Sequence, residues 1–242
     1  MTRRTLLLSA ATALWPRTST QWITTDINGQ IRQANWQDAA HPLSFGSLLK
    51  PFLAIAYLRT HPQPPVIRCA GASAGCWYPQ GHGSQDIVAA LANSCNVYFL
   101  HIAEALSRPA LDLTCMAHGL AVPSRAWPAA RLIGLGEGWP QPPQAVVRAF
   151  ASLARDAADP HTRLVLSGML RCSESGTAKR IGVRCYAKTG TAAPSVQRAT
   201  GDGYVVAIYP IEQPRTVLLF SRHNTTGAEA AKDMRPLITA LG

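Results

Sequence analysis

The chain has 242 residues, of which 47% are hydrophobic and 15% are charged. It is therefore long and apolar enough to bury a sizeable core, and it is not intrinsically disordered. The formal net charge of +10 favours anionic partners, but the arginines are scattered and form no basic block, so we expect no nucleic-acid ligand.

The N-terminus has the pattern of a secretory signal peptide. Its first residues, MTRRTLLLSAATALW, combine a basic start with a short apolar run and an Ala11-Thr12-Ala13 site of the A-x-A type. We predict a signal peptide over residues 1–20. No later run reaches the roughly 18 apolar residues of a membrane helix. We therefore expect an exported, periplasmic protein whose mature chain has no membrane span.

Two elements are predicted at the start of the mature chain. Asn28-Gly29 separates two runs of alternating apolar and polar residues, which indicates an antiparallel hairpin. The run from Ser47 to Leu58 is almost entirely apolar and indicates a buried helix. Pro51 places the start of this helix near Ser47, because proline is tolerated in the first turn of a helix but not in its interior.

Residues 59–180 are predicted to be mostly helical, with breaks at loops rich in Pro and Gly. Helical spacing is found in SQDIVAALANSCNVYFLHIAEAL, with an interruption at residues 94–96, and again in QPPQAVVRAFASLARD and HTRLVLSGML. After residue 180 the pattern changes to three short strands, VRCYAKTGTA, GYVVAIYP and RTVLLFSR. A final helix is predicted in GAEAAKDMRPLITAL.

Strands at both ends of the chain and helices between them predict an α/β protein of the α+β type. We expect one antiparallel sheet of about five strands with flanking helices. Residues 21–58 and 181–242 would form the sheet subdomain of a single domain spanning residues 21–242. Residues 59–180 would form an inserted helical subdomain.

The six cysteines are compatible with export, but their pairing cannot be deduced from the sequence. Cys69 and Cys76 flank a short Gly-rich loop and are the best local candidates for a disulfide. No C-x-x-C pair or Cys/His cluster has the spacing of a zinc site. We therefore predict neither a metal nor another cofactor.

Lysine is scarce in this chain, with only four residues, yet Lys50 lies within the apolar run. Its ammonium could simply reach the surface past its own apolar stem. Ser47, however, lies three residues earlier and thus on the same face of the helix. A buried, neutral lysine can accept the proton of such a serine, and the helix N-terminus offers unpaired N–H groups to an attacked carbonyl.

Two further motifs follow in order. They are Ser94-x-Asn96 and Lys188-Thr189-Gly190, and each alone is a weak signal. Together with Ser47-x-x-Lys50 they give the S-x-x-K, S-x-N and K-T-G series of β-lactamases and penicillin-binding proteins.

The chain resembles the transpeptidase domain of a penicillin-binding protein of the class B style, from Trp22 onward. The segment GSLLKPFLAIAYL resembles the family's nucleophile helix, and CWYPQGHGSQDIVAALANSCNVYF resembles the approach to its second motif. GLGEGWPQPPQAVVRAFASLA and ESGTAKRIGVRCYAKTGTA resemble its Gly-rich stretch and its third-motif strand. The implied fold is that of the β-lactamase and transpeptidase superfamily.

The resemblance implies a serine D,D-peptidase that forms an acyl-enzyme. Ser47 would be the acylated nucleophile and Lys50 its general base. Ser94 would pass a proton to the leaving group, and Lys188 would hold Ser94 and supply positive potential. The implied substrate is a D-Ala-D-Ala peptidoglycan stem peptide, processed by transpeptidation or carboxypeptidation, with β-lactams as inhibitors. Protein partners cannot be deduced.

The resemblance also implies the substrate-binding residues. Asn96 would bind the substrate amide, and Thr189 and Thr191 would anchor its terminal carboxylate. The two hydroxyls are expected on one face of the strand, because they are two residues apart. Gly190 would leave room for a substrate along the strand, and the N–H groups of Ser47 and Thr191 would form the oxyanion hole.

Several departures from the family pattern leave alternatives open. Ala187 and Glu137 stand where Gly and Gln are more usual, and we expect a bare catalytic domain without pedestal, glycosyltransferase domain or anchor. No E-x-x-N follows the second motif, which disfavours a class A β-lactamase. A class D-like β-lactamase remains an alternative, although that class usually has Val at the position of Asn96. A non-catalytic sensor of β-lactam or peptidoglycan is the other.

The stretch Gly71–Gly75, GASAG, matches the nucleophile elbow G-x-S-x-G around Ser73. That motif requires a strand before it and a helix after it. The residues that follow indicate a loop, so we interpret GASAG as a turn between two cysteines.

Overall fold

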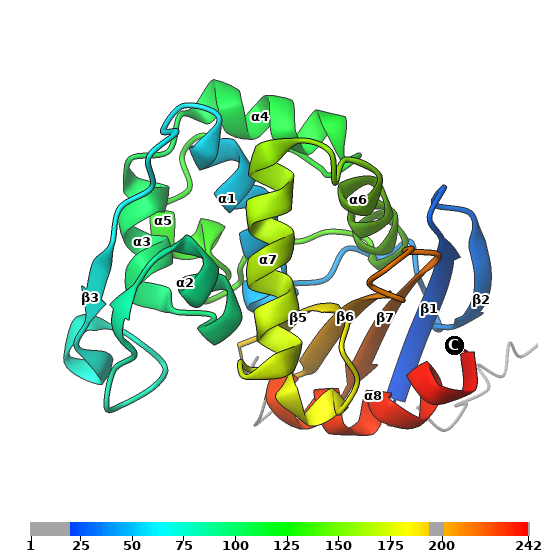
Figure 1. The fold of residues 1–242 in the computed structure, drawn as a ribbon. Coiled ribbons are helices and arrows are strands. Elements are labelled where there is room, and N and C mark those ends of the chain that lie inside the picture. The colour runs from blue at the N-terminus through cyan, green and yellow to red at the C-terminus, as the bar shows by residue number, and fades with distance from the viewer. Residues whose placement is uncertain (1–19, 194–200, 242) are drawn as a thin grey trace, which may run out of the picture.

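The computed structural model describes residues 20–193 and 201–241, so residues 1–19 of the predicted signal peptide lie outside the described residues. Its centre is a five-stranded antiparallel sheet with the strand order β2-β1-β7-β6-β5 (Figure 1). This confirms the predicted fold class. The strands are β1 (Thr20–Asp26), β2 (Ile31–Asn35), β5 (Tyr186–Thr191), β6 (Gly203–Tyr209) and β7 (Thr216–Arg222).

The N-terminal hairpin forms where Asn28-Gly29 predicted it. The Asp26 carboxylate closes the turn by accepting hydrogen bonds from the N–H groups of Asn28 and Gln30, both at 2.9 Å. Gly29 has a φ of +82°, a conformation that favours glycine. Because β1 also pairs with β7 along its whole length, the two ends of the chain meet in the middle of the sheet.

Helices cover both faces of the sheet, as Figure 1 shows. Helix α8 (Gly227–Leu241) covers one face and buries Met234 against Val205 and Leu218. Helix α6 (Pro143–Arg155) covers the other face and buries Phe150 in the same cluster as Val206. The β6 sequence GYVVAIY is therefore continuously apolar, because both of its faces are buried.

The remaining helices form a group beside the sheet around the wholly buried α1 (Lys50–Leu58). A 3₁₀ turn, Gly46–Leu49, leads into α1, so regular α-helix begins three residues after Ser47. The interruption predicted at residues 94–96 separates α2 from α3. The helices of this group are α2 (Ile87–Asn93), α3 (Asn96–Glu104), α4 (Arg108–Ala117), α5 (Ala129–Leu132) and α7 (Pro160–Glu174).

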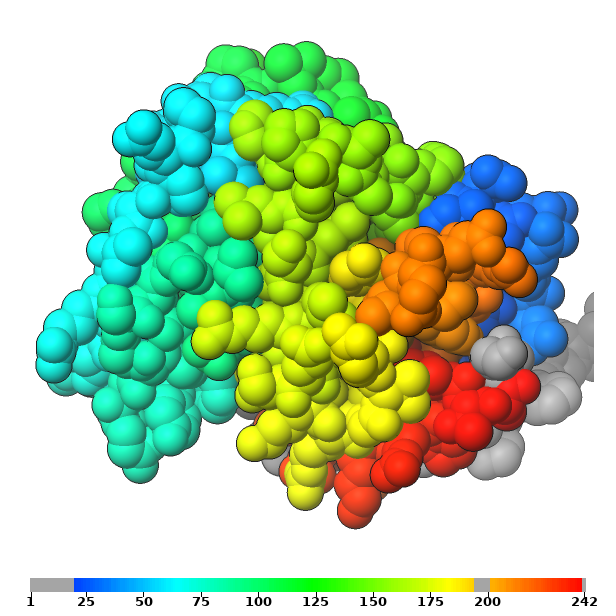
Figure 2. Space-filling model, in the orientation of Figure 1, coloured from blue at the N-terminus to red at the C-terminus, as the bar shows by residue number. Residues whose placement is uncertain are grey.

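The segment after α1 contains an element that the sequence pattern did not predict. The short strands β3 (Ile67–Cys69) and β4 (Gly83–Gln85) pair antiparallel and form a separate two-stranded sheet. With three residues each, they are too short to show an alternating pattern. The chain between them forms the lower left corner of the molecule in Figures 1 and 2. Over the described residues, no helix is both long and apolar enough to cross a membrane.

Candidate active site

The structure brings the three sequence motifs together. Ser47 lies in the 3₁₀ turn before α1, Ser94 lies between α2 and α3, and Lys188 lies on the edge strand β5. The Nζ of Lys188 donates a 2.9 Å hydrogen bond to the Ser94 hydroxyl. The Nζ of Lys50 donates to the side-chain oxygen of Asn96 at 2.8 Å. These contacts join segments separated by 46 and 94 residues.

Ser94 has a left-handed backbone conformation, with a φ of +52°. This region is uncommon for residues other than glycine and is found more often at functional sites than elsewhere. The conformation lets the chain end α2 at Asn93 and begin α3 at Asn96 within two residues. It thus places the side chains of Ser94 and Asn96 beside Lys188 and Lys50, respectively.

Lys50 is wholly buried, and its hydrogen bonds orient its amine. Nζ donates to the Ser94 carbonyl at 3.0 Å and to Asn96 at 2.8 Å. A neutral amine has two N–H bonds and one lone pair, so these two acceptors use both protons and leave the lone pair for another partner. Among the residues that the structure describes, no hydrogen bond joins Lys50 to the Ser47 hydroxyl. Ser47 and Lys50, which the sequence places on one face of the helix, are therefore not hydrogen-bonded to each other in this state.

The two buried lysines differ in their acidity. Burial, followed by the nearby charge of Lys188, holds the pKa of Lys50 well below its ordinary value. Burial lowers the pKa of Lys188 to about 8. At neutral pH, Lys188 therefore remains mostly an ammonium, whereas Lys50 is shifted toward the neutral amine. Such a division of pKa values is what a site needs to hold a base and a fixed cation together.

Gly190 and Gly46 allow β5 to pack directly on the turn that carries Ser47. A β-carbon at Gly190 would overlap the Phe45 carbonyl oxygen, and one at Gly46 would overlap the Thr191 carbonyl. From the family resemblance we expected Gly190 to leave room for a substrate along the strand. In the structure this space is occupied by the backbone just before Ser47, so the glycine first serves the close packing of two protein segments.

The two strand threonines have different surroundings. Thr189 is buried, and its hydroxyl lies 2.5 Å from that of Thr177 in the loop after α7. Thr191 is exposed, and its oxygen accepts a 3.0 Å hydrogen bond from the Gly227 N–H at the start of α8. Because a hydroxyl can accept and donate together, Thr191 keeps its proton for a ligand.

The alternative nucleophile and base from the sequence lie elsewhere. Ser73 sits in a short 3₁₀ helix, Gly71–Ala74, and its hydroxyl donates to the Ala70 carbonyl at 3.4 Å. Glu137 is exposed, and its carboxylate pairs with Arg131 at 3.1 Å.

The structure corrects the interpretation of the cysteines. All six are free thiols, so Cys69 and Cys76, the best local candidates for a disulfide, are not bonded to each other. Instead the thiols of Cys69, Cys76 and Cys95 gather with the imidazole of His82, and their ligand atoms all lie within 4.8 Å of one another. These residues are seven, six and thirteen positions apart along the chain, so they do not have the spacing of a zinc motif. Only the fold brings the loop that contains GASAG close to the S-x-N motif, and no sequence pattern indicates this proximity.

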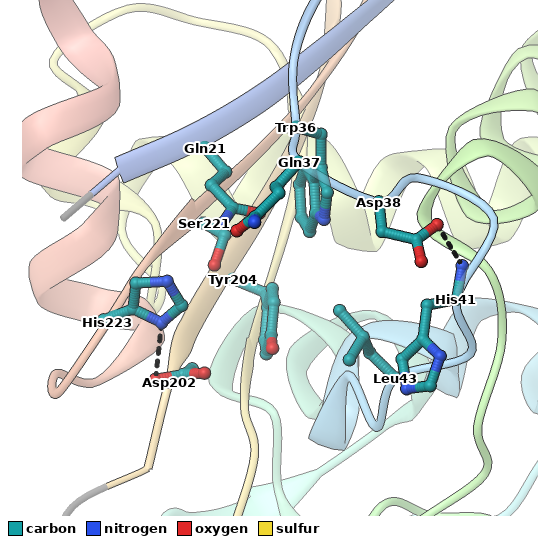
Figure 3. Close-up of a pocket in the computed structure, with 10 residues that line it drawn as sticks. All are labelled: Gln21, Trp36, Gln37, Asp38, His41, Leu43, Asp202, Tyr204, Ser221 and His223. Carbon is teal, nitrogen blue, oxygen red and sulfur yellow. Dashed lines mark hydrogen bonds and ion pairs between the residues drawn. The ribbon is translucent and has the colours of Figure 1, made fainter. Parts of the chain in front are cut away.

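A separate pocket of about 370 Å³ lies between β1, β6, β7 and the segment after β2 (Figure 3). None of the motif residues lines it. One of its walls is Tyr204, whose ring packs at 4.7 Å against Phe45, two residues before Ser47. At another wall, the Nδ1 of His223 lies 3.2 Å from a carboxylate oxygen of Asp202.

Comparison with known proteins identifies the fold. No family model and no curated protein matches the sequence. The structure, however, has the fold of penicillin-binding protein transpeptidase domains, which confirms the resemblance at the level of the fold.

Three solved structures illustrate the likeness. Penicillin-binding protein 2 of Pseudomonas aeruginosa, in complex with WCK 5153, has a TM-score of 0.76 at 18% identity; the match covers 92% of this chain and 73% of that one. The transpeptidase domain of penicillin-binding protein 3 from Burkholderia pseudomallei has a TM-score of 0.71 at 17% identity, with 91% and 88% covered. Penicillin-binding protein 2 of Helicobacter pylori has 0.72 at 18%, with 92% of this chain but 60% of that chain covered.

Proposed function

We propose that this protein is a serine D,D-peptidase or transpeptidase that acts on D-Ala-D-Ala stem peptides of peptidoglycan and binds penicillin. The observation that carries the proposal is the pair of contacts from Lys50 to Asn96 and from Lys188 to Ser94. These contacts link the motif that contains Ser47 to the other two motifs, on a fold that is similar to penicillin-binding protein transpeptidase domains. Export to the periplasm, where such peptides are found, remains part of the proposal.

In the first step, Ser47 attacks the carbonyl carbon between the two D-alanines. Lys50 takes the serine proton through its lone pair, which the bonds to Ser94 and Asn96 leave unoccupied. The developing oxyanion would be stabilised by the N–H groups of Ser47 and Thr191, whose backbones are brought together at Gly46.

In the second step, the C–N bond breaks and the leaving amine takes up a proton. The Ser94 hydroxyl accepts its hydrogen bond from Lys188, so it can give its own proton to that amine and take one in return from the Lys188 ammonium. Lys50 holds the proton taken from Ser47, so the net transfer is from Ser47 to the leaving amine. The Ser47 ester then reacts with water to give a shortened peptide, or with an amine to give a cross-link. Asn96, whose oxygen is bound to Lys50, keeps its NH₂ group to donate to the substrate amide.

The rate of acylation should have a bell-shaped dependence on pH. It should rise as Lys50 loses its proton, because only the neutral amine can accept the Ser47 proton. It should fall as pH rises through about 8, where Lys188 loses the charge that attracts the substrate carboxylate. The rate of acylation by a labelled penicillin, measured at a series of pH values, tests both the rise and the fall. A rate that keeps rising well above pH 8 would contradict the role of Lys188.

Carboxylate recognition by β5 gives a further prediction. A stem peptide whose terminal carboxylate is amidated should lose about tenfold or more in kcat/KM, which corresponds to one charge-assisted hydrogen bond. Thr191→Val should lose a similar amount on the free acid and little on the amide, because the amide already lacks the charge that Thr191 binds. Steady-state kinetics on the four combinations measure the coupling between the two changes.

The matched control is Thr239→Val, an exposed threonine on α8 whose hydroxyl donates to the Arg235 carbonyl. It should react like the unchanged protein with both peptides. Equal rates on the free and amidated peptides would show that β5 does not recognise the carboxylate, and the D,D-peptidase proposal would lose its main support.

A further inference from the structure

Three cysteines and one histidine gather next to the second motif. Cys69 ends β3, Cys76 and His82 follow on the loop to β4, and Cys95 comes from the junction of α2 and α3. The three cysteines are buried and the histidine is half-buried. The catalytic proposal uses none of these four side chains.

The distances in this cluster fit a tetrahedral metal site. The Nδ1 of His82 lies 3.4 Å from the sulfur of Cys76 and 3.6 Å from that of Cys69. Zinc bonds of about 2.3 Å to sulfur and 2.0–2.1 Å to nitrogen give a sulfur–nitrogen separation of about 3.6 Å at the tetrahedral angle. The ligand atoms are therefore already near the positions that they would occupy around an ion.

The loop is built to hold this arrangement. Gly71 and Gly81 have φ values of +88° and +79°, and each lies too close to neighbouring backbone to accept a β-carbon. The two strands that flank the loop pair over only three residues each, and a hairpin of this size is marginally stable by itself. Trp77 and Tyr78 are substantially exposed, so the loop buries little apolar surface. A cross-link through a metal would supply the stability that packing does not.

We propose that Cys69, Cys76, His82 and Cys95 bind a zinc ion, and that this ion fixes the turn bearing Ser94 and Asn96. Three thiolates and one imidazole select thiophilic cations, and four protein ligands leave no open position, as in structural zinc sites. Cys95 stands between the two motif residues, so the ion would anchor both to the β3–β4 loop.

A hydrogen bond already links the same two segments. The indole N–H of Trp77 donates to the carbonyls of Asn93 and Ser94, both at 3.2 Å. The rings of Trp77 and Tyr78 lie 5.4 and 5.1 Å from that of His82 and shield the cluster on one side. An ion in the cluster would thus add a second link between the β3–β4 loop and the turn bearing Ser94, which the Trp77 hydrogen bonds already join.

The direct test measures metal in the purified full chain, prepared without chelator. We expect one zinc per chain by elemental analysis. Replacement by Co²⁺ should give the thiolate charge-transfer band and intense d–d bands of a tetrahedral centre. Removal of the ion by a chelator should lower the Tm, and its return should restore the Tm.

Single substitutions locate the site. Cys76→Ser and Cys95→Ser should each weaken zinc binding by more than about 100-fold. Cys115→Ser, a buried cysteine outside the cluster, should bind zinc like the unchanged protein. Circular dichroism verifies that each variant folds. If Cys95→Ser fails to fold, Cys76→Ser and the chelated wild-type chain still decide the question.

Two results would overturn the metal site. One is a folded chain that binds neither Zn²⁺ nor Co²⁺; the other is a disulfide between two of the three cluster cysteines. The anchoring role rests on the proposed function, so it is tested separately by acylation of the chelated and refilled chain. If zinc binds with the expected ligands but its removal leaves acylation unchanged, the anchoring role is wrong while both the site and the Ser47 chemistry stand.

Discussion

Ser47→Ala should abolish acylation by a labelled penicillin. Ser47 carries the hydroxyl that would form the ester, and loss of such a nucleophile lowers kcat by about 10⁶ in a serine hydrolase. Ser47 is half-exposed in the 3₁₀ turn, so the substitution should leave the Tm nearly unchanged. Intact-protein mass spectrometry after incubation with the penicillin measures the adduct.

Ser73→Ala is the matched control for this experiment. Ser73 is an exposed serine in a 3₁₀ helix and belongs to the competing G-x-S-x-G motif. It should acylate at the rate of the unchanged protein. Labelling of the Ser47→Ala protein, or loss of labelling in the Ser73→Ala protein, would show that Ser47 is not the nucleophile.

Lys50→Arg should slow acylation by at least about 100-fold although it keeps the positive charge. General base catalysis contributes about 10²–10⁴ in rate, and a guanidinium does not give up its proton in proteins. Lys50 is fully buried, and this burial, followed by the charge of nearby Lys188, lowers its pKa and favours the neutral amine. Rapid-quench labelling with a penicillin measures the rate.

The control is Lys179→Arg, the same substitution at an exposed lysine, which should change nothing. Arginine is larger than lysine, and position 50 is fully buried. The Tm and the circular dichroism spectrum of each variant are therefore compared first, to verify that it folds. A folded Lys50→Arg protein that acylates at a near-normal rate would exclude Lys50 as the general base.

The sequence was sufficient to predict the sheet and the convergence of the motifs. Local patterns identified the hairpin at Asn28-Gly29, the buried helix after Ser47 and the three C-terminal strands, because each has a regular period or a turn residue. The order of the motifs predicted that distant segments would meet, and the contact of Lys188 with Ser94 bears out this convergence. The roles of these residues in catalysis stay predictions.

Other features depend on tertiary packing and have no local signal. The space at Gly190 is filled by backbone from Phe45, a contact that no spacing within β5 could indicate. The Lys50 amine donates its hydrogen bonds to Ser94 and Asn96 and not to Ser47. Both acceptors lie in a turn more than 40 residues away, so no pattern near Lys50 could indicate them. Short strands such as β3 and β4 fall below the length at which alternation can be recognised.

The cysteine cluster is another feature that depends on tertiary packing and could not be predicted from local sequence patterns. Spacing alone suggested a local disulfide between Cys69 and Cys76 and no metal ligands. The fold instead brings Cys95 and His82 to the same loop. Four ligands drawn from one loop and a distant helix junction cannot be recognised from intervals within a single motif.

The D,D-peptidase proposal depends on a covalent acyl-enzyme between Ser47 and penicillin. It is tested most directly by following the intact mass of the unchanged protein over time with a labelled penicillin, and then mapping the label by peptide digestion. We expect one adduct per chain that persists after free penicillin is removed and lies on the peptide containing Ser47. No adduct, or an adduct on another residue, would contradict the Ser47 acyl-enzyme. Rapid release of hydrolysed penicillin would instead favour the β-lactamase alternative over the D,D-peptidase.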